Sequence, residues 1–137
     1  MFSSGTTGNP KPIIFSQQDL DGLKQSIKRF LEIHNSKGTL YNLFPSAPHI
    51  AYNATRYYSE FSNSLTINTG GGKVIPTTSV LMLMKKIYPE IIAGTPDYII
   101  HVLNEAKKQN INLNKVNTII GANGFSKART TPLLAIL

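Results

Sequence analysis

The sequence predicts an α/β domain in which short strands alternate with helices and form a mostly parallel sheet. Short apolar segments recur along the chain, as at 40–44, 90–93 and 116–120. Longer segments between them carry apolar residues at helical spacing, and glycine, proline and asparagine mark the boundaries. This alternation favours βαβ units, whose parallel sheets bind ligands at the carboxyl ends of their strands.

The first predicted elements are a short strand over 12–15 and a helix that follows it. Ser16 is a good N-cap, and Asp19 takes the acidic position of a capping box, less well than glutamate would. The helix runs to about His34, and the polar segment 35–38 ends it. Its apolar stripe consists of Leu20, Leu23, Ile27, Phe30 and Leu31.

The middle of the chain is predicted to hold a buried strand over 40–44 and a helix over 53–65. The helix prediction rests on a stripe formed by Tyr57, Phe61 and Leu65. Glycines occupy all of 70–72, without hydroxyl and lysine partners in a useful order. We therefore expect this triplet to end a helix rather than to bind phosphate.

Three further strands are predicted, and two of them lead into helices. Thr78 or Ser79 caps the first of these helices. The segment 95–97 opens the second with a cap, a proline and an acid near the positive end of the helix dipole. The last strand ends at Gly121. These strands span 73–75, 90–93 and 116–120.

Composition narrows the class of protein. A chain of 137 residues is one domain by size. The net charge of +7 comes from 14 basic and 7 acidic residues spread along the chain, which makes a nucleic-acid-binding domain the least favoured alternative. No cysteine occurs and the 3 histidines lack ligand spacing, so no metal site is predicted. No signal peptide or membrane-spanning run is present, which predicts a cytoplasmic protein without a membrane partner.

The most informative segment is the loop over 3–11, Ser-Ser-Gly-Thr-Thr-Gly-Asn-Pro-Lys. Its glycines let the backbone approach a ligand closely, and the amides between them can form a nest for an anion. The hydroxyls and the lysine add donors and positive charge. The alternative is a disordered N-terminus. The residues predicted to bind nucleotide phosphates are Ser3, Ser4, Gly5, Thr6, Thr7, Gly8 and Lys11.

This loop resembles the phosphate-binding signature of the AMP-forming adenylating enzymes. Three further segments are similar, in the same order, to phenylacetate–CoA ligases and their relatives. Residues 73–76 resemble a strand of that family, 88–99 resemble its P-D-I-I-x-x-T-P-S-Y stretch, and 119–124 resemble its G-A-E turn. The resemblance covers essentially the whole chain. Residues 1–137 therefore look like a partial AMP-binding (adenylation) domain, a piece of the large N-terminal domain of an adenylate-forming enzyme.

The resemblance implies a two-step reaction. A carboxylate attacks the α-phosphate of ATP, and a thiol, usually that of CoA, then takes the acyl group. ATP with Mg²⁺ and the co-substrate CoA are thus implied for the full-length parent, together with a carboxylic acid substrate. The implied adenine side consists of Gly121, Ala122 and Asn123, where the family has glutamate at the last position. Tyr52 and Asn53 match positions that help to line the acyl pocket.

The resemblance also implies that the later catalytic parts lie outside this chain. The family's segment that closes over the nucleotide and Mg²⁺, its ribose-binding aspartate and its mobile C-terminal domain with a catalytic lysine would all follow Leu137. No catalytic residue is assigned, and we expect the chain alone not to form an acyl-adenylate. It is then either a slice of an acyl-CoA ligase or a non-catalytic remnant that packs with a partner subunit. The cue for the remnant is a set of uncovered apolar residues, Leu133, Leu134, Ile136 and Leu137.

Overall fold

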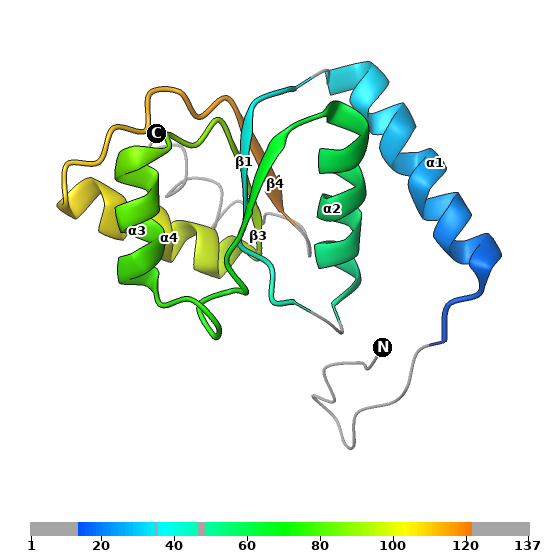
Figure 1. Ribbon diagram of the computed structural model, residues 1–137, viewed down its shortest axis with the longest axis horizontal. Helices are drawn as coiled ribbons and strands as arrows, with labels where there is room; N and C mark the ends of the chain where they lie inside the picture. Colours follow the sequence, from blue (N-terminus) through cyan, green and yellow to red (C-terminus); the bar gives the residue numbers. More distant parts are fainter. Residues whose placement is uncertain (1–13, 35, 47–48, 122–137) are drawn as a thin grey trace.

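The computed structural model describes residues 14–34, 36–46 and 49–121. Within them, four parallel strands form one sheet with helices on both faces (Figure 1). The strand order is β2-β1-β3-β4. The strands are β1 over Thr39–Asn42, β2 over Leu65–Asn68, β3 over Ile91–Gly94 and β4 over Thr118–Gly121. The predicted α/β fold with a parallel sheet is confirmed.

The helices form two layers on opposite faces of the sheet (Figure 1). α1 (Gln17–His34) and α2 (Ile50–Ser62) cover one face, and α3 (Thr77–Lys86) and α4 (Pro96–Lys108) cover the other. From β1 the chain moves outward to β2, and it then crosses back over β1 to reach β3. Right-handed crossovers in opposite directions place their helices on opposite faces of a sheet.

The two central strands, β1 and β3, are buried on both faces, as expected for a parallel sheet. Successive residues point to opposite faces, so Leu40 packs under α1 and α2 whereas Tyr41 packs under α3 and α4. The smaller core, on the α1/α2 side, consists of Ile27, Leu40, Tyr57, Tyr58 and Ile91. The larger core, on the other side, consists of Tyr41, Leu43, Val80, Leu81, Met84, Ile92, Ile99, Val102, Leu103, Ala106 and Ile111.

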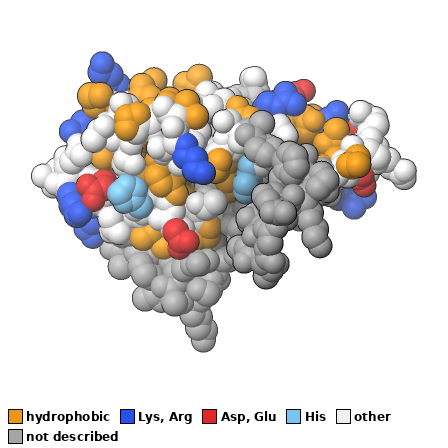
Figure 2. Space-filling view, turned by 90° about the horizontal axis from the view of Figure 1, so that it is seen from below, with side chains coloured by type: hydrophobic (Ala, Val, Ile, Leu, Met, Phe, Trp, Pro, Cys, Tyr) orange, Lys and Arg blue, Asp and Glu red, His pale blue; other side chains and the backbone are white. Residues whose placement is uncertain are grey.

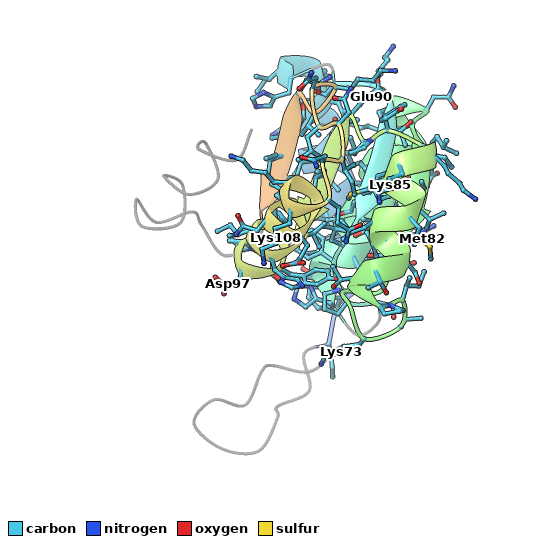
Figure 3. The ribbon with its side chains drawn as sticks, turned by 90° about the vertical axis from the view of Figure 1, so that its left-hand side faces the viewer. Lys73, Met82, Lys85, Glu90, Asp97 and Lys108 are labelled. Atoms are coloured by element: carbon cyan, nitrogen blue, oxygen red, sulfur yellow. The ribbon has the colours of Figure 1, made fainter. Side chains whose placement is uncertain are left out.

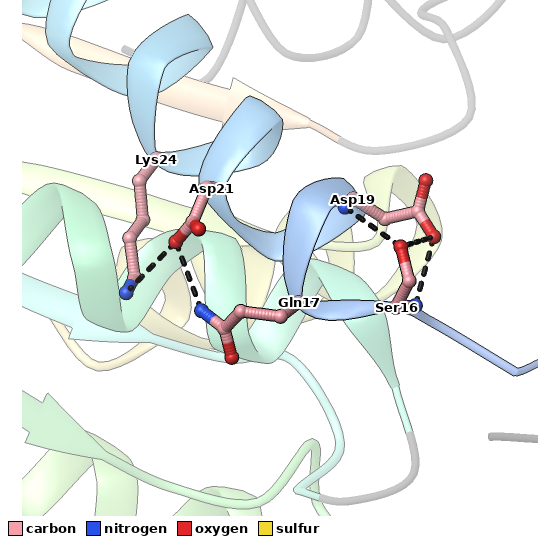
Figure 4. A network of polar contacts seen from close by, with 5 residues as sticks. All are labelled: Ser16, Gln17, Asp19, Asp21 and Lys24. Carbon is pink, nitrogen blue, oxygen red and sulfur yellow. Dashed lines mark hydrogen bonds and ion pairs between the residues drawn. The ribbon is translucent and has the colours of Figure 1, made fainter.

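The predicted capping box at the start of α1 is confirmed (Figure 4). The Ser16 N–H donates to Asp19 Oδ2 at 2.8 Å, and the Asp19 N–H donates to Ser16 Oγ at 3.2 Å. The Ser16 hydroxyl also donates to Asp19 Oδ2, at 2.7 Å. The two hydrogen bonds that Ser16 donates to Asp19 Oδ2, first that of the hydroxyl and then that of the N–H, lower the pKa of the Asp19 carboxyl. One turn further on, Asp21 accepts a hydrogen bond from Gln17 and lies 3.6 Å from the Lys24 ammonium.

Proline lies at the start of both α3 and α4, and neither helix has a side-chain cap. Pro96 is the first residue of α4 after Thr95, as predicted, although the Thr95 side chain makes no capping hydrogen bond. The predicted cap at Thr78 or Ser79 is wrong, because α3 begins at Thr77 with Pro76 as its N-cap residue. The Pro76 carbonyl accepts the Ser79 N–H at 2.9 Å, and the helix starts two or three residues earlier than the predicted caps implied.

The predicted helix over 53–65 is displaced in the structure. α2 begins at Ile50 and ends at Ser62, and Asn63 follows in the left-handed conformation with φ of 54°. Asparagine tolerates this conformation, and the Asn63 N–H donates to the Ser59 carbonyl, which closes the helix. Leu65 therefore does not extend the apolar stripe of the helix but begins β2.

The predictions for the segment after β2 are wrong. Gly70, Gly71 and Gly72 follow a strand instead of ending a helix, with φ values of 72°, 66° and 77°. Residues 73–75 form bends and not a strand, since the Lys73 N–H donates to the Gly70 carbonyl and the Ile75 N–H to the Thr69 carbonyl. The strand that lies between α2 and α3 is β2 instead.

The structure also differs from two predictions about strands, those over 12–15 and 116–120. Of the strand predicted over 12–15, residues 12 and 13 lie outside the described residues, and Ile14 and Phe15 are not in a strand. β4 begins at Thr118 and is half-buried, because it lies at one edge of the sheet.

At the amino end of the sheet, the Glu90 carboxylate accepts the Thr39 N–H at 2.7 Å, and Lys73 lies at the opposite, carboxyl end (Figure 3).

Candidate functional site

The strand order creates a topological switch point between β1 and β3, and ligands of open α/β sheets bind outside the carboxyl ends of the strands at such points. In this chain, the backbone after β1 stays close to the end of β3 at the switch point. The Leu43 N–H donates to the Ala93 carbonyl at 2.6 Å. A Cβ on Gly94 would lie 2.9 Å from the Leu43 Cβ, so glycine is what allows this close approach. Any ligand near this edge must therefore lie toward one helical layer.

A cavity of about 330 Å³ opens on the α1/α2 side of the same region. It lies between the two helices, the segment after β1 and the end of β4. Its walls take Ser26, Ile27 and Phe30 from α1, Ala51, Ala54, Thr55 and Tyr58 from α2, Phe44 from the segment after β1, and Ile120 and Gly121 from β4.

The cavity presents mainly apolar groups, because its hydroxyls already donate to main-chain carbonyls. Ser26 donates to the Gly22 carbonyl at 2.9 Å and Thr55 to the Ala51 carbonyl at 2.8 Å. Tyr58 donates to the Ser36 carbonyl at 2.9 Å. Burial raises the pKa of Tyr58, while the hydrogen bond with Ser36 lowers it. A ligand in this space therefore meets rings and alkyl groups rather than free donors.

Phe44, on one wall of the cavity, is held by the buried side-chain amide of Asn42. The fully buried Asn42 donates from Nδ2 to Asn68 Oδ1 at 3.0 Å and accepts the Phe44 N–H at Oδ1 at 3.2 Å. The Asn42 carbonyl accepts both the N–H and the hydroxyl of Thr69. These bonds tie the ends of β1 and β2 together and fix the direction in which the chain leaves β1 toward Phe44.

The glycine turn after β2 packs against the other side of this edge. A Cβ on Gly71 would lie 2.8 Å from the Pro45 nitrogen, and one on Gly72 would lie 2.9 Å from Tyr98 Oη. Tyr98 Oη lies 3.3 Å from Thr77 Oγ1, which joins the starts of α3 and α4. The turn therefore closes the α3/α4 side and leaves space on the α1/α2 side.

Most of the site residues predicted from the sequence fall outside the described residues. These are Ser3, Ser4, Gly5, Thr6, Thr7, Gly8, Lys11, Ala122 and Asn123, and the apolar C-terminal residues from Leu133 onward lie there too. Gly121 is described, at the end of β4 and in the cavity wall. Tyr52 and Asn53 are half-buried on α2, but the wall takes Ala51 and Ala54 from that helix. The acyl-pocket role of Tyr52 and Asn53 stays a prediction.

Sequence reasoning missed several wall residues. Ala51, Ala54 and Thr55 recur three and four positions apart on α2, which places small side chains on one face of the helix. That spacing was the available signal, but small residues on a helix are also ordinary packing residues. Phe44 carried no signal, because it was predicted as the last residue of a buried strand.

The described residues bring neither a cluster of metal-ligating side chains nor a patch of basic side chains to this site. Among residues 14–34, 36–46 and 49–121, no group of three or more His, Cys, Asp or Glu comes together that could hold a metal ion. Lys24 lies over the Tyr57 ring at 5.2 Å and Lys28 over the Phe61 ring at 4.9 Å, so both take part in packing α1 on α2. Figure 2, which shows the side of the carboxyl ends, has basic side chains scattered rather than gathered in one patch.

The helices of the described part of the chain are not membrane spans. None is both long enough and apolar enough to cross a bilayer.

Comparison with known proteins confirms the resemblance predicted from the sequence. No family model matches the chain. The chain is 29% identical over 131 residues to a phenylacetate–coenzyme A ligase of Aromatoleum evansii, covering 89% of this chain. It is 28% identical over 116 residues to the phenylacetate–coenzyme A ligase of Escherichia coli K12. The chain spans only 28% of the first relative and 24% of the second, a quarter or so of their length.

Solved structures share the fold. An open conformation of 2-hydroxyisobutyryl-CoA ligase in complex with 2-HIB-AMP and CoA aligns with a TM-score of 0.75 at 13% identity, over 96% of this chain and 32% of that one. A cobalamin-binding protein from Desulfitobacterium hafniense aligns with a TM-score of 0.56 at 16% identity, over 83% of this chain and 61% of that one. The structural likeness shows the fold, and the sequence likeness points to the ligases.

Proposed function

We propose that this chain is the acid- and nucleotide-binding slice of an ATP-dependent, AMP-forming acyl-CoA ligase, and that it is inactive alone. The observation that carries this proposal is the apolar cavity at the carboxyl end of β4, in a chain whose relatives are named phenylacetate–coenzyme A ligases. In those relatives the acid to be activated has an apolar ring. The cavity supplies walls of the matching chemistry, so we assign it to the apolar body of a carboxylic acid.

The proposed nucleotide side adjoins this cavity. Gly121 belongs both to the cavity wall and to the segment predicted to border adenine. A nucleotide bound along the predicted adenine side, with phosphates on the loop over 3–11, would then meet the acid at the carboxyl end of β4. This arrangement suits a carboxylate attacking an α-phosphate, a reaction in which the protein mainly positions the reactants. The described residues offer no carboxylate cluster for Mg²⁺, so we assign it no ligands.

Binding of an apolar acid tests the proposal directly. We expect phenylacetate, added to the isotope-labelled chain, to shift the amide NMR signals of Ala51, Ala54 and Gly121 and to leave those of α4 in place. Adding Mg·ATP should shift the signals of 3–11 and 121–124. Shifts from neither ligand at millimolar concentration would contradict the proposal. Shifts from the acid alone would support the cavity and contradict the nucleotide side.

Catalysis is a separate expectation. We expect no carboxylate-dependent exchange of pyrophosphate into ATP by the purified chain, because it spans only 28% of the phenylacetate–coenzyme A ligase that it matches. Exchange above that of a heat-denatured sample would show that this expectation is wrong.

A second candidate function is a non-catalytic module that packs with a partner. The observation in its favour is a pair of exposed apolar side chains: Leu65, on the edge strand β2, is 60% exposed, and Met82, which projects from α3, is 59% exposed (Figure 3). Within the described residues, β2 pairs only with β1. Coexpression with a phenylacetate–coenzyme A ligase from which the matching segment has been deleted tests this. A stable complex would favour a packing role, and separate elution of the two proteins would oppose it.

A further inference from the structure

Thr55 brings a buried hydroxyl to the wall of the cavity. It belongs to α2, lines the cavity and is only 4% exposed. Its hydroxyl donates to the Ala51 carbonyl at 2.8 Å, and Ala51 and Ala54 are themselves wall residues. The Thr55 hydroxyl is therefore held within the stretch of α2 that lines the cavity.

The proton of this hydroxyl is committed to the main chain, but its oxygen can still accept a hydrogen bond. A hydroxyl has one proton to donate and two lone pairs that accept. None of the described residues donates a hydrogen bond to Thr55 Oγ1. The other wall hydroxyls, those of Ser26 and Tyr58, also donate to main-chain carbonyls. The side-chain hydroxyls of the wall thus offer acceptors and no free donor.

This imbalance distinguishes acids by the polar substituent on their body. A hydroxyl substituent can donate to Thr55 Oγ1. An ether oxygen cannot, and it loses its hydrogen bonds to water on entering the cavity, which costs free energy because a buried acceptor is left unsatisfied. We propose that Thr55 is a specificity-determining residue that accepts a hydrogen bond from a hydroxyl group on the apolar body of the acid. This assignment rests on the proposed function, because it takes the cavity to be the site of the acid.

Four substituted phenylacetates test the assignment as two matched pairs. The 4-hydroxy and 4-methyl acids differ by a donor in place of a methyl group, and the 4-methoxy and 4-ethyl acids differ by an acceptor in place of a methylene group. The variant Thr55→Val removes the oxygen and keeps the branched shape of the side chain. Thr78→Val is the matched control, since Thr78 is exposed on α3. Affinities are measured by NMR titration of the full chain.

We expect the unaltered chain to bind the 4-hydroxy and 4-methyl acids with affinities within about threefold of each other, and the 4-methoxy acid about tenfold more weakly than the 4-ethyl acid. Thr55→Val should weaken binding of the 4-hydroxy acid about tenfold, because the phenolic hydroxyl is then buried without its acceptor. The same variant should leave binding of the 4-methyl acid within about threefold, and Thr78→Val should change the binding of none of the four acids.

A second readout needs no variant and therefore does not depend on how Thr55→Val folds. In the unaltered chain, the Thr55 methyl group should show nuclear Overhauser contacts with the ring protons beside the hydroxyl of bound 4-hydroxyphenylacetate. Absence of these contacts from the bound acid would overturn the role of Thr55. Equal affinity for the 4-hydroxy acid in Thr55→Val and the unaltered chain, or equal weakening of the 4-hydroxy and 4-methyl acids, would overturn it as well.

The outcomes separate this proposal from the one on which it rests. Binding of the 4-methyl and 4-ethyl acids together with equally tight binding of the 4-methoxy acid would keep the cavity as the site of an acid and overturn its selection among substituents. Binding of none of the four acids would overturn the assignment of the cavity to an acid, and the role of Thr55 with it.

Discussion

The two helical layers of this sheet differ in how they fill the space over it. The α3/α4 layer holds the larger core, and Tyr41, Met84 and Leu103 in it are fully buried. The α1/α2 layer holds a smaller core and a cavity of about 330 Å³. The two faces carry different strand residues, such as Leu40 and Tyr41. The helices differ as well, because α2 lines the hollow side with Ala51 and Ala54, whereas α4 packs Ile99, Val102 and Leu103 into the larger core.

This difference predicts a division of labour, in which one layer stabilises the fold and the other binds ligand. A dense layer gains free energy from burying apolar area, whereas a cavity gives up part of that gain. The α3/α4 layer should therefore supply most of the stability of the fold, and the α1/α2 layer should tolerate changes that alter binding.

The largest effect should come from truncating the dense layer. Leu103→Ala removes a fully buried side chain and should lower the free energy of unfolding by about 3 kcal/mol. Ile27→Ala, in the hollow layer, should cost about 1–2 kcal/mol, because Ile27 already borders open space. Urea unfolding followed by circular dichroism measures both. An equal or larger cost for Ile27→Ala would contradict the division of labour.

A backbone substitution at the closed edge should have the next largest effect. Gly71→Ala must adopt φ near 66° and would bring its Cβ to 2.8 Å from the Pro45 nitrogen, so we expect a loss of about 2 kcal/mol. Gly22→Ala is the control within the hollow layer. A Cβ there meets nothing within 4 Å, and alanine favours a helix, so we expect a gain of about 0.5–1 kcal/mol. Thermal unfolding would show shifts of opposite sign, and shifts of the same sign would refute this reading of the turn.

The dense layer should also respond to alkali. Burial raises the pKa of Tyr41 from 10.0 to about 12, and its hydroxyl donates to the Ile87 carbonyl at 2.6 Å. A folded-state pKa above the unfolded value means stability that is present below pH 10 and is lost as the pH rises toward 12. Tyr41→Phe should flatten this part of the pH dependence of the unfolding free energy. Tyr52→Phe, at a half-buried position on α2, is the control, and an unchanged slope in Tyr41→Phe would count against the assignment.

Filling the cavity should have the smallest effect on stability. Ala54→Leu adds a side chain to a hollow wall and should change the unfolding free energy by less than about 1 kcal/mol while abolishing the binding of phenylacetate that we propose for the cavity. The matched substitution Ala106→Leu adds the same group to a fully buried position of the dense layer and should cost about 1–3 kcal/mol. Comparable costs for the two leucines would show that the layers do not differ in this way.

The sequence predicted those elements whose signals are local. The Ser16–Asp19 capping box and Pro96 place α1 and α4, and the strand interior at Ile91–Ala93 follows from its apolar run. β2 was missed because Leu65 continues the spacing of Tyr57 and Phe61, and only the left-handed Asn63 breaks the helix before it. The strand predicted at 73–75 failed for a related reason: a β-branched pair cannot show that the preceding glycines turn the chain.

The candidate site was harder to predict because it depends on contacts between distant segments. Phe44 faces the cavity through a hydrogen bond to Asn42, whose own position is held by Asn68 and Thr69 from another strand. Small residues such as Ala54 carry no chemical signature. The family resemblance suggested Tyr52 and Asn53 for the acyl pocket, and that role stays a prediction, while the wall of the cavity takes Ala51 and Ala54 from the same helix.

The parallel arrangement of the strands also predicts an order of folding. β1 pairs with β2 through Thr39 and Leu65, 26 positions apart, and β3 pairs with β4 through Ile91 and Thr118, 27 positions apart. The central pairing of Leu40 with Ile91 joins residues 51 positions apart. Loop-closure entropy rises with separation, so two βαβ units of nearly equal span should form before the central pair joins them. The closed switch point at Leu43 and Gly94 is then a late contact, made when the two halves of the chain meet.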